Sequence, residues 1–380
     1  FRDNQYGFRV GGAAIKNKLF FFVNGELGRR NEPNLFTLPF YTRNNPAAQD
    51  RILAELNQIR RIHQERFNYD PGDPLANYDN IQNNNKLFTR LDFNLNDKHT
   101  FTLRLNYIKA FSQEIFRNNT NFSFPNSGTR ITNTTNTTVF EVQSRFTNKL
   151  SNEFRVGYTN IFDIRANEER DFPSMRVNVA DLGTVITGLD RIAGANSLRQ
   201  NLIEITNHLT WFKDKHKFLF GTRNEIYQFN NIFIQAVAGE WSFASVSAPR
   251  DPITGALDPT APNFSLESGV PIAFLKNYSR TDDPRQGAKW SAVQLGLYVQ
   301  DEWSVNERLR LTLGLRADLP MMLGSVSRNR LFEEKFGVRN DLTPTAKVLW
   351  SPRVGFNWVA NSKGTKQVRG GIGVFGGRPP

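Results

Sequence analysis

Hydrophobic and polar residues alternate strictly at several places along the chain. The clearest case is residues 308–316, where Leu309, Leu311, Leu313 and Leu315 are separated by arginine, threonine and glycine. A period of two places the leucines on one face of a β-strand and the polar residues on the other. The same alternation recurs at 87–95, 101–107, 140–146, 154–159 and 203–211. The polar positions carry full charges of both signs, as expected where the second face of a strand meets water.

The connections between these strands are of two kinds. Short polar turns at 16–18, 96–99, 148–151, 213–216, 305–308 and 361–364 each predict a hairpin. Long stretches without alternation lie between the hairpins, at 29–83, 112–135, 167–199, 244–286 and 321–349. Short turns at one end and long loops at the other are typical of outer-membrane barrels, whereas a β-sandwich shows no such bias. The sequence therefore predicts an all-β fold, an antiparallel transmembrane β-barrel with short periplasmic turns and long extracellular loops.

One of the long loops contains a predicted helix. Residues 46–67 carry Ile52, Leu56, Ile59 and Ile62 at spacings of three and four, which indicates one apolar helical face. Two interpretations remain open: a lid or docking helix, and a helix that packs within its own loop.

Composition agrees with strands rather than helices as membrane-crossing elements. The chain of 380 residues is 39% hydrophobic and its mean hydropathy is −0.50. The apolar run at 19–23 is far shorter than the roughly 20 residues of a membrane helix, but a barrel strand needs only about 9–11 alternating residues. The 32 phenylalanines fit the aromatic girdles of a barrel. The absence of cysteine fits export through an oxidising periplasm.

The net charge of +12 comes from basic residues spread along the whole chain. Nucleic-acid binding is disfavoured, because these residues do not gather in one tract or on one helix face. Basic loops would favour an anionic or polyol cargo, and they would equally meet the phosphates of lipopolysaccharide.

No pattern predicts catalysis, a cofactor or a metal. The Gly-x-Gly-x-x-Gly at 371–376 would need a following helix to hold a dinucleotide, and no helical periodicity follows it. The four histidines lack metal-like spacing, and no cysteine is present. Asp301 and Glu302 are adjacent strand residues that point to opposite faces, and Asp282-Asp283 is expected to face water, so neither forms a glycosidase pair. We expect a protein that is not an enzyme.

Charged residues on the polar faces of the strands are the candidate functional residues. They are expected to face the lumen of the barrel, where they would contact other parts of the protein or its cargo: Arg90, Asp92, Arg104, Glu141, Arg145, Arg155, Glu204, Arg310 and Arg316.

Several segments resemble the Oar-like branch of the TonB-dependent receptors, whose N-terminal domain is carboxypeptidase-regulatory-like. The most specific match is Leu-Tyr-Val-Gln-Asp-Glu-Trp at 297–303, running into Leu-Thr-Leu-Gly-Leu-Arg at 311–316. Similar segments are Asn-Gln-Tyr-Gly-Phe-Arg-Val-Gly-Gly at 4–12 with Lys-Leu-Phe-Phe-Phe at 18–22, 86–92 with 95–99, Ser-Pro-Arg-Val-Gly-Phe at 351–356, and Arg-Gly-Gly-Ile-Gly at 369–373. The matches cover most predicted strands and few loops.

The resemblance implies a barrel of roughly 22 strands in the bacterial outer membrane, of which about 12–14 lie in residues 1–380. It further implies a plug domain, coupling to TonB, import of a substrate, and contact with outer-membrane lipid. The chain carries no recognisable signal peptide, plug, TonB box or terminal aromatic strand, so we expect a piece from within the barrel. The alternatives are a secreted soluble β-protein that binds or hydrolyses polysaccharide, and a passive porin without TonB coupling.

Overall fold

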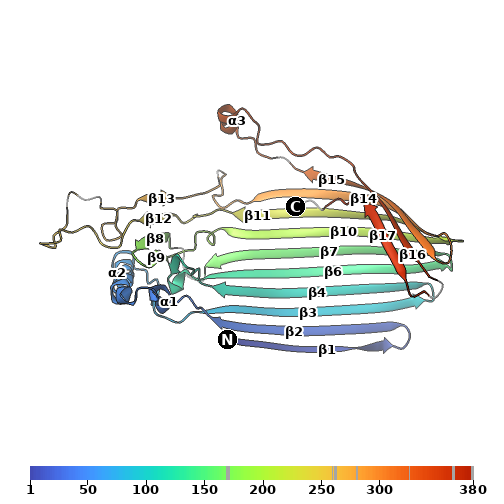
Figure 1. Cartoon of the computed structure of the whole chain (residues 1–380), viewed down its shortest axis with the longest axis horizontal. Coiled ribbons are helices and arrows are strands. Elements are labelled where there is room, and N and C mark those ends of the chain that lie inside the picture. The colour runs from blue at the N-terminus through green and yellow to red at the C-terminus, as the bar shows by residue number, and fades with distance from the viewer. Residues whose placement is uncertain are drawn as a thin grey trace.

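A large antiparallel sheet dominates the computed structural model, which describes residues 1–167, 172–258, 260, 263–279, 281–324, 326–361 and 364–377. Within these residues, twelve strands follow the order β1-β2-β3-β4-β6-β7-β10-β11-β14-β15-β16-β17 (Figure 1). Their bounds are β1 (Arg2–Ile15), β2 (Leu19–Pro33), β3 (Asp79–Asn96), β4 (His99–Glu114), β6 (Thr129–Thr147), β7 (Leu150–Asn167), β10 (Asn196–Lys213), β11 (His216–Phe233), β14 (Ala288–Ser304), β15 (Leu309–Leu323), β16 (Leu349–Val359) and β17 (Gln367–Gly373). The predicted strand number and antiparallel class are confirmed.

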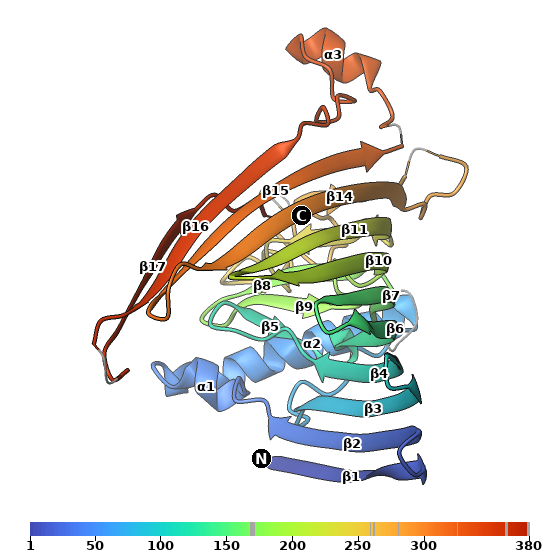
Figure 2. The same ribbon diagram turned by 90° about the vertical axis from the view of Figure 1, so that its right-hand side faces the viewer.

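This sheet is curved and open. β1 and β17 are its two edges, and neither is paired on its outer side within the described residues. Figure 2 shows β14 to β17 bending away from the plane of the first strands, so that the sheet encloses a concave side. The sheet therefore has the form of part of a barrel wall, and it does not close into a complete barrel.

The two faces of the sheet differ as the alternation predicts. Leu91, Leu313 and Val354 are 44%, 41% and 51% exposed on one face, which we call the apolar face. Charged and amide side chains occupy the other, which we call the polar face. At the loop end of the sheet, polar-face residues line a cavity together with loop residues 34–36 and 115–117. These loop residues precede α1 (Leu38–Thr42) and β5 (Asn121–Ser123), which lie on the concave side of the sheet (Figure 2). The polar face is therefore the concave one, and the apolar face is the convex one.

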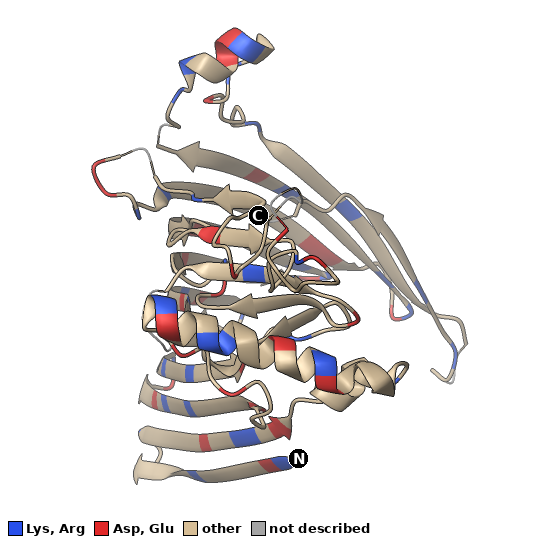
Figure 3. Ribbon diagram, turned by 90° about the vertical axis from the view of Figure 1, so that its left-hand side faces the viewer, with Lys and Arg blue, Asp and Glu red and all other residues tan. Residues whose placement is uncertain are grey.

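The long loops assemble into a second folded layer at one end of the sheet. Its five short strands follow the order β13-β12-β8-β9-β5. α1 (Leu38–Thr42) and α2 (Gln49–Phe67) lie beside them, and we call this assembly the cap. Figure 3 shows α2 running across the strand ends. The remaining bounds are β5 (Asn121–Ser123), β8 (Ser174–Val179), β9 (Gly183–Thr187), β12 (Glu240–Phe243), β13 (Ala273–Leu275), the 3-10 helices η1 (Pro46–Ala48) and η2 (Pro125–Ser127), and α3 (Arg330–Phe336) in another loop.

The hydrophobic core of the molecule lies in the cap. Four loops contribute to one buried cluster, which consists of Leu38, Ala48, Ile52, Leu56, Ile59, Ile62, Phe122, Phe124, Met175, Val177, Val179, Leu182, Val185, Phe243, Val246 and Leu266. The sheet itself, by contrast, buries few apolar side chains. None of the helices in the described residues has the length and apolar character that a membrane crossing requires.

The structure corrects two details of the sequence prediction. The strands reach further into the predicted loops, so that β6 already begins at Thr129, within the stretch at 112–135 that was predicted to be a loop. The predicted irregular stretches contain the cap strands β5, β8, β9 and β13. The helix predicted at 46–67 exists as η1 and α2, and it packs both on α1 of its own loop and on strands from other loops. The turn predicted at 361–364 lies partly outside the described residues.

Candidate functional site

The register of the sheet places all nine predicted lumen residues on the polar face. Direct pairing links Arg90 to Arg104, Asp92 to Thr102, Thr102 to Glu141, and Glu141 to Arg155. Glu204 lies opposite Glu225, and Arg316 lies opposite Tyr298. Arg145 and Arg310 fall on the same face because they stand an even number of residues from Glu141 and Arg316 on their own strands. The nine residues thus share one face of the sheet, and their contact with a lumen stays a prediction.

Glu141 is the centre of the first ion-pair network. Its side chain is 10% exposed and accepts from Arg104 at 2.8 Å and from Arg155 at 3.1 Å. Arg155 also pairs with Glu153 at 2.5 Å. Beside this network, Arg90 binds Asp92 in a bidentate contact with both distances 2.8 Å. A planar guanidinium matches a carboxylate in this geometry, so these contacts fix the side chains across four strands.

A second network continues across β10 and β11, and a third lies on β15. Arg223 donates to Glu204 at 2.5 Å and to Glu225 at 2.9 Å. Arg316 binds Asp318 in a bidentate contact with both distances 2.7 Å. Sequence reasoning missed Arg223, Glu225, Asp318 and Glu153. Their signal is present in the sequence, because opposite charges two residues apart on a strand lie on the same face.

Two predicted residues stand outside these networks. Arg145 is exposed at the turn end of the sheet, where it lines a shallow cavity with Asp97 and Glu153. Arg310 is also exposed near a turn. Ion pairs thus join seven of the nine residues: Arg90, Asp92, Arg104, Glu141, Arg155, Glu204 and Arg316. Arg145 and Arg310 lie outside these ion pairs, near the turns of the sheet.

Aromatic side chains gather on the apolar face near the turns. Trp211 and Phe218 have ring centroids 5.6 Å apart, and His216 stacks between Phe218 and Trp303 at 5.4 and 5.5 Å. Asp301 binds His216 at 2.6 Å on this face, while Glu302 binds Lys217 at 3.3 Å on the polar face. The opposite orientation predicted for Asp301 and Glu302 is therefore confirmed. Aromatic rings beside an exposed apolar band are the features of a surface that meets lipid.

The cap contains a fully buried histidine, His63 on α2. Its Nδ1 lies 2.8 Å from the carbonyl oxygen of Ile59, and its Nε2 lies 2.8 Å from the hydroxyl oxygen of Thr187 on β9. The carbonyl can only accept, so Nδ1 carries the proton and the Thr187 hydroxyl donates to Nε2. Burial lowers the pKa of His63, which favours the neutral ring. His63 therefore ties the helix to the cap sheet.

The glycine-rich motif and the histidines show no cofactor geometry. Gly371 and Gly373 lie in β17, and no helix follows as far as Gly377, where the described part of the chain ends. No group of three or more histidine, aspartate or glutamate side chains suited to a metal ion occurs in the described ranges.

Comparison with known proteins identifies the family to which this sheet belongs. A family model for an outer membrane beta barrel domain matches residues 37–380. The structure is similar to the outer membrane transporter YddB from Escherichia coli, with a TM-score of 0.57, 11% identity, and coverage of 98% of this chain and 38% of that one. It is also similar to P. aeruginosa FpvA bound to a heterologous pyoverdine and iron, with a TM-score of 0.53, 13% identity, and coverage of 95% and 39%.

A third similar structure is the siderophore receptor PirA from Acinetobacter baumannii, with a TM-score of 0.51, 13% identity, and coverage of 98% and 40%. The chain thus spans about two fifths of the length of these solved structures. A comparison with curated protein sequences gave no significant match. At this identity the structures show a shared fold of outer-membrane transporters and receptors. With the matching family model, they show that the chain belongs to the outer membrane beta-barrel domain family and resides in the bacterial outer membrane.

Proposed function

We propose that this chain is part of the barrel wall of a TonB-dependent receptor of the Oar-like branch, which binds a substrate and imports it with energy transmitted by TonB. The observation that carries the proposal is the concave polar face with its ion-pair networks, lying beneath a folded cap. A wall of this kind suits an occupied lumen, because fixed charges of both signs can bind a plug domain and cargo.

The open edges of the sheet support a larger barrel. β1 and β17 have unpaired backbone groups on their outer sides in the described residues. Such edges are unstable in a lipid bilayer, where no water satisfies backbone N–H and C=O groups. Further strands would satisfy them, and a chain that spans about two fifths of similar transporters leaves room for these strands and for a plug.

The charged residues of the polar face take the role of lumen contacts. Glu141 and Glu204 hold arginines in place, so the guanidinium groups are presented to the lumen in fixed positions. The cap faces the cell exterior and offers the first surface that cargo meets. Basic side chains on the outer loops would also contact the phosphates of lipopolysaccharide.

Coupling to TonB separates this proposal from a passive porin. The first test is capture of the full-length protein, in detergent, by the purified periplasmic domain of TonB immobilised on a surface. Specific capture that increases when cargo is present supports coupling. The second test is swelling of proteoliposomes in arabinose. Rapid swelling without capture by TonB would refute the coupled receptor in favour of a porin.

The remaining alternative, a secreted soluble β-protein, makes a different prediction. The apolar face would then have to be covered by protein, and the purified chain would be a compact monomer in plain buffer. We expect instead that the folded protein requires detergent and migrates faster on a gel before heating than after it. A soluble monomer in plain buffer would refute the barrel-wall assignment.

A further inference from the structure

The convex apolar face changes its character toward the cap end of the sheet. Closer to the turns its residues are apolar, and Leu105 and Leu297, for example, are 44% and 66% exposed. Further along the strands the same face carries the exposed basic residues Lys109 on β4, Arg199 on β10 and Lys289 on β14. Each stands an even number of residues from the apolar residues of its own strand, and therefore points to the same side.

Backbone pairing places these three basic residues in one row across the sheet, which we call the basic row. The row runs through directly paired residues of six neighbouring strands, in the order Lys109, Thr134, Phe162, Arg199, Asn230 and Lys289. Neighbouring strands lie about 4.8 Å apart, so the backbone of Lys109 is about 14 Å from that of Arg199, and Arg199 is about 10 Å from Lys289.

The basic row has no countercharge within the protein. No carboxylate of the described residues forms an ion pair with any of its three members. Among the described strand positions at this end of the convex face, the one carboxylate is Asp79, the first residue of β3, four strands away from Arg199. Arg29 and Arg130 stand further out on the same face and add positive charge. The guanidinium carbon of Arg199 lies 4.4 Å from the ring centroid of Phe162, which holds this cation at the surface.

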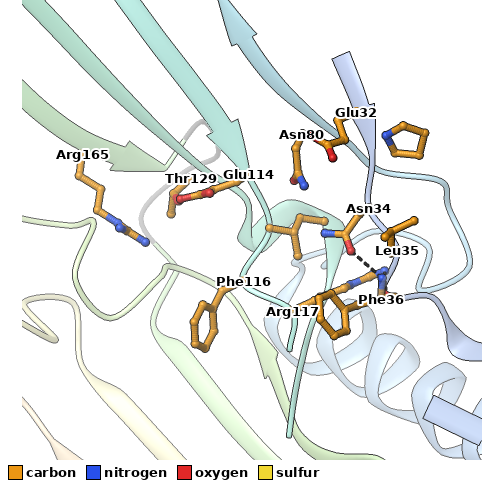
Figure 4. A pocket seen from close by; sticks show the side chains of 12 residues that line it. Glu32, Asn34, Leu35, Phe36, Asn80, Glu114, Phe116, Arg117, Thr129 and Arg165 are labelled. Atoms are coloured by element: carbon orange, nitrogen blue, oxygen red, sulfur yellow. Dashed lines mark hydrogen bonds between the residues drawn. The ribbon is translucent and has the colours of Figure 1, made fainter. Parts of the chain in front are cut away.

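The concave face at the same end of the sheet carries charges of both signs. Figure 4 shows the carboxylates of Glu32 and Glu114 and the guanidinium groups of Arg117 and Arg165 around one cavity on this side. Arg165 also pairs with Asp190 at 2.8 Å. The excess of positive charge is therefore a property of the convex face and not of the whole cap end.

The turn end of the convex face is mixed in sign as well. The Nζ of Lys213 lies 5.4 Å from the ring centroid of Trp211, and nearby the carboxylate of Asp301 binds His216 at 2.6 Å. The apolar band thus has two unlike borders: one with both signs at the turns, and one with the basic row at the cap. A ligand that fits the second border has apolar chains to lie on the band and anionic groups beside them.

We propose that the basic row binds the phosphate groups of lipopolysaccharide, whose acyl chains lie on the apolar face below it. The long stems of Lys109 and Arg199 pack along the apolar band while their charged ends reach the phosphates. The members of the row are further apart than the screening length of about 8 Å at physiological ionic strength, so a lipid with several phosphates fits better than a lipid with a single one. The proposal rests on the proposed function only in placing the cap outside the cell.

The test is a titration of the full-length protein in detergent with three lipids. The lipids are diphosphorylated lipid A, the same lipid A with its phosphates removed, and phosphatidylglycerol. We expect diphosphorylated lipid A to bind at least tenfold more tightly than either of the others, and inorganic phosphate at the same concentration to leave it bound. Equal binding of dephosphorylated lipid A would overturn the proposal, and equal binding of phosphatidylglycerol would replace lipopolysaccharide with any anionic lipid. Displacement by inorganic phosphate would mean that the surface binds the free ion.

Arg199→Gln is the most informative single variant, because Lys213→Gln offers a matched control on the same strand. Both residues are exposed on the convex face and lie over an aromatic ring, but Lys213 is at the turn end. A basic residue beside an anionic lipid surface increases affinity about fivefold, so Arg199→Gln should weaken lipid A binding about fivefold, and a variant that also carries Lys109→Gln and Lys289→Gln about a hundredfold. Lys213→Gln should bind as the unsubstituted protein does. Equal affinities of the folded triple variant and of Lys213→Gln would refute the assigned surface.

Lipid binding and transport fail separately in this design. Preferential binding of lipid A by a protein that TonB does not capture would count against the proposed import and leave the basic row intact. Capture by TonB without preference for lipid A would have the opposite meaning. The orientation has its own test: a membrane-impermeant maleimide should label Asn57→Cys on α2 in intact cells and leave the unsubstituted protein unlabelled.

Discussion

Leu56 on α2 offers the sharpest test of the cap as a folded unit. Its side chain is fully buried at 0% exposure within a cluster to which four loops contribute. Replacing a buried leucine with alanine costs about 2–5 kcal/mol, through lost transfer free energy and the remaining cavity. Taking about 3 kcal/mol, and about 1.4 kcal/mol for each factor of ten, the cap of Leu56→Ala should open more than a hundredfold more often.

Hydrogen exchange of the full-length protein in detergent measures this opening directly. Protection of α2 and of the cap strands β8 and β9 should fall by about two orders of magnitude, because local opening exposes their amides. Protection of β10 and β11 in the sheet should stay unchanged, since the core of the cap and the pairing of the sheet are separate. Asn57→Ala on the exposed side of α2 is the control, and it should leave the cap protected.

Two results would refute this reasoning. Unchanged protection of α2 in Leu56→Ala would mean that the helix is not packed on the cap sheet. An equal loss in the cap and in the sheet would mean that the two layers open together, so that the cap is not a unit of its own.

Three further predictions concern single residues. Glu141→Gln removes the carboxylate that Arg104 binds and leaves Arg155 with Glu153 alone. Both arginines are about one third exposed, so the free energy of unfolding in urea should fall by about 1–3 kcal/mol, while Glu307→Gln on an exposed turn changes nothing measurable. Burial lowers the pKa of His63 below 6.5, so hydrogen-exchange protection of the cap should be constant above pH 6.5 and should fall as the pH drops below that value. Constant protection down to pH 4.5 would contradict a neutral ring in the folded cap. Gly188 has φ +75°, and a Cβ there would lie 2.1 Å from a backbone oxygen, so Gly188→Ala should lower the free energy of opening the cap by more than about 2 kcal/mol. Gly255→Ala, with φ +70° and open space around the Cβ, should lower it by less.

Local pattern was sufficient to predict the sheet. The leucines at 309–315 and the alternation at 87–95 gave the strands and their two faces, because side-chain direction in a strand depends only on position along it. The ion pairs of Arg90 with Asp92 and of Arg316 with Asp318 follow from the same rule, since both pairs are two residues apart. The contact of Glu141 with Arg104 and Arg155 depends on cross-strand register, which the sequence does not show.

Tertiary pairing decided where the strands end. β6 begins at Thr129, in a stretch of asparagine and threonine that reads as a loop. Asparagine has low strand propensity, but β4 and β7 flank this segment and satisfy its backbone on both sides. Pairing with neighbours outweighs an intrinsic preference that spans only about 1 kcal/mol.

The cap and its cavity belong to the tertiary structure alone. The apolar face of α2 was readable from the spacing of its isoleucines and Leu56, but its partners lie on loops far away in the chain. Arg117 looks like any loop arginine in the sequence, and only the structure shows that its side chain is buried. The sequence by itself determined the period and the faces of the sheet, because these are local. Which loops meet, and which charges remain unpaired, depends on contacts between distant segments that no local pattern contains.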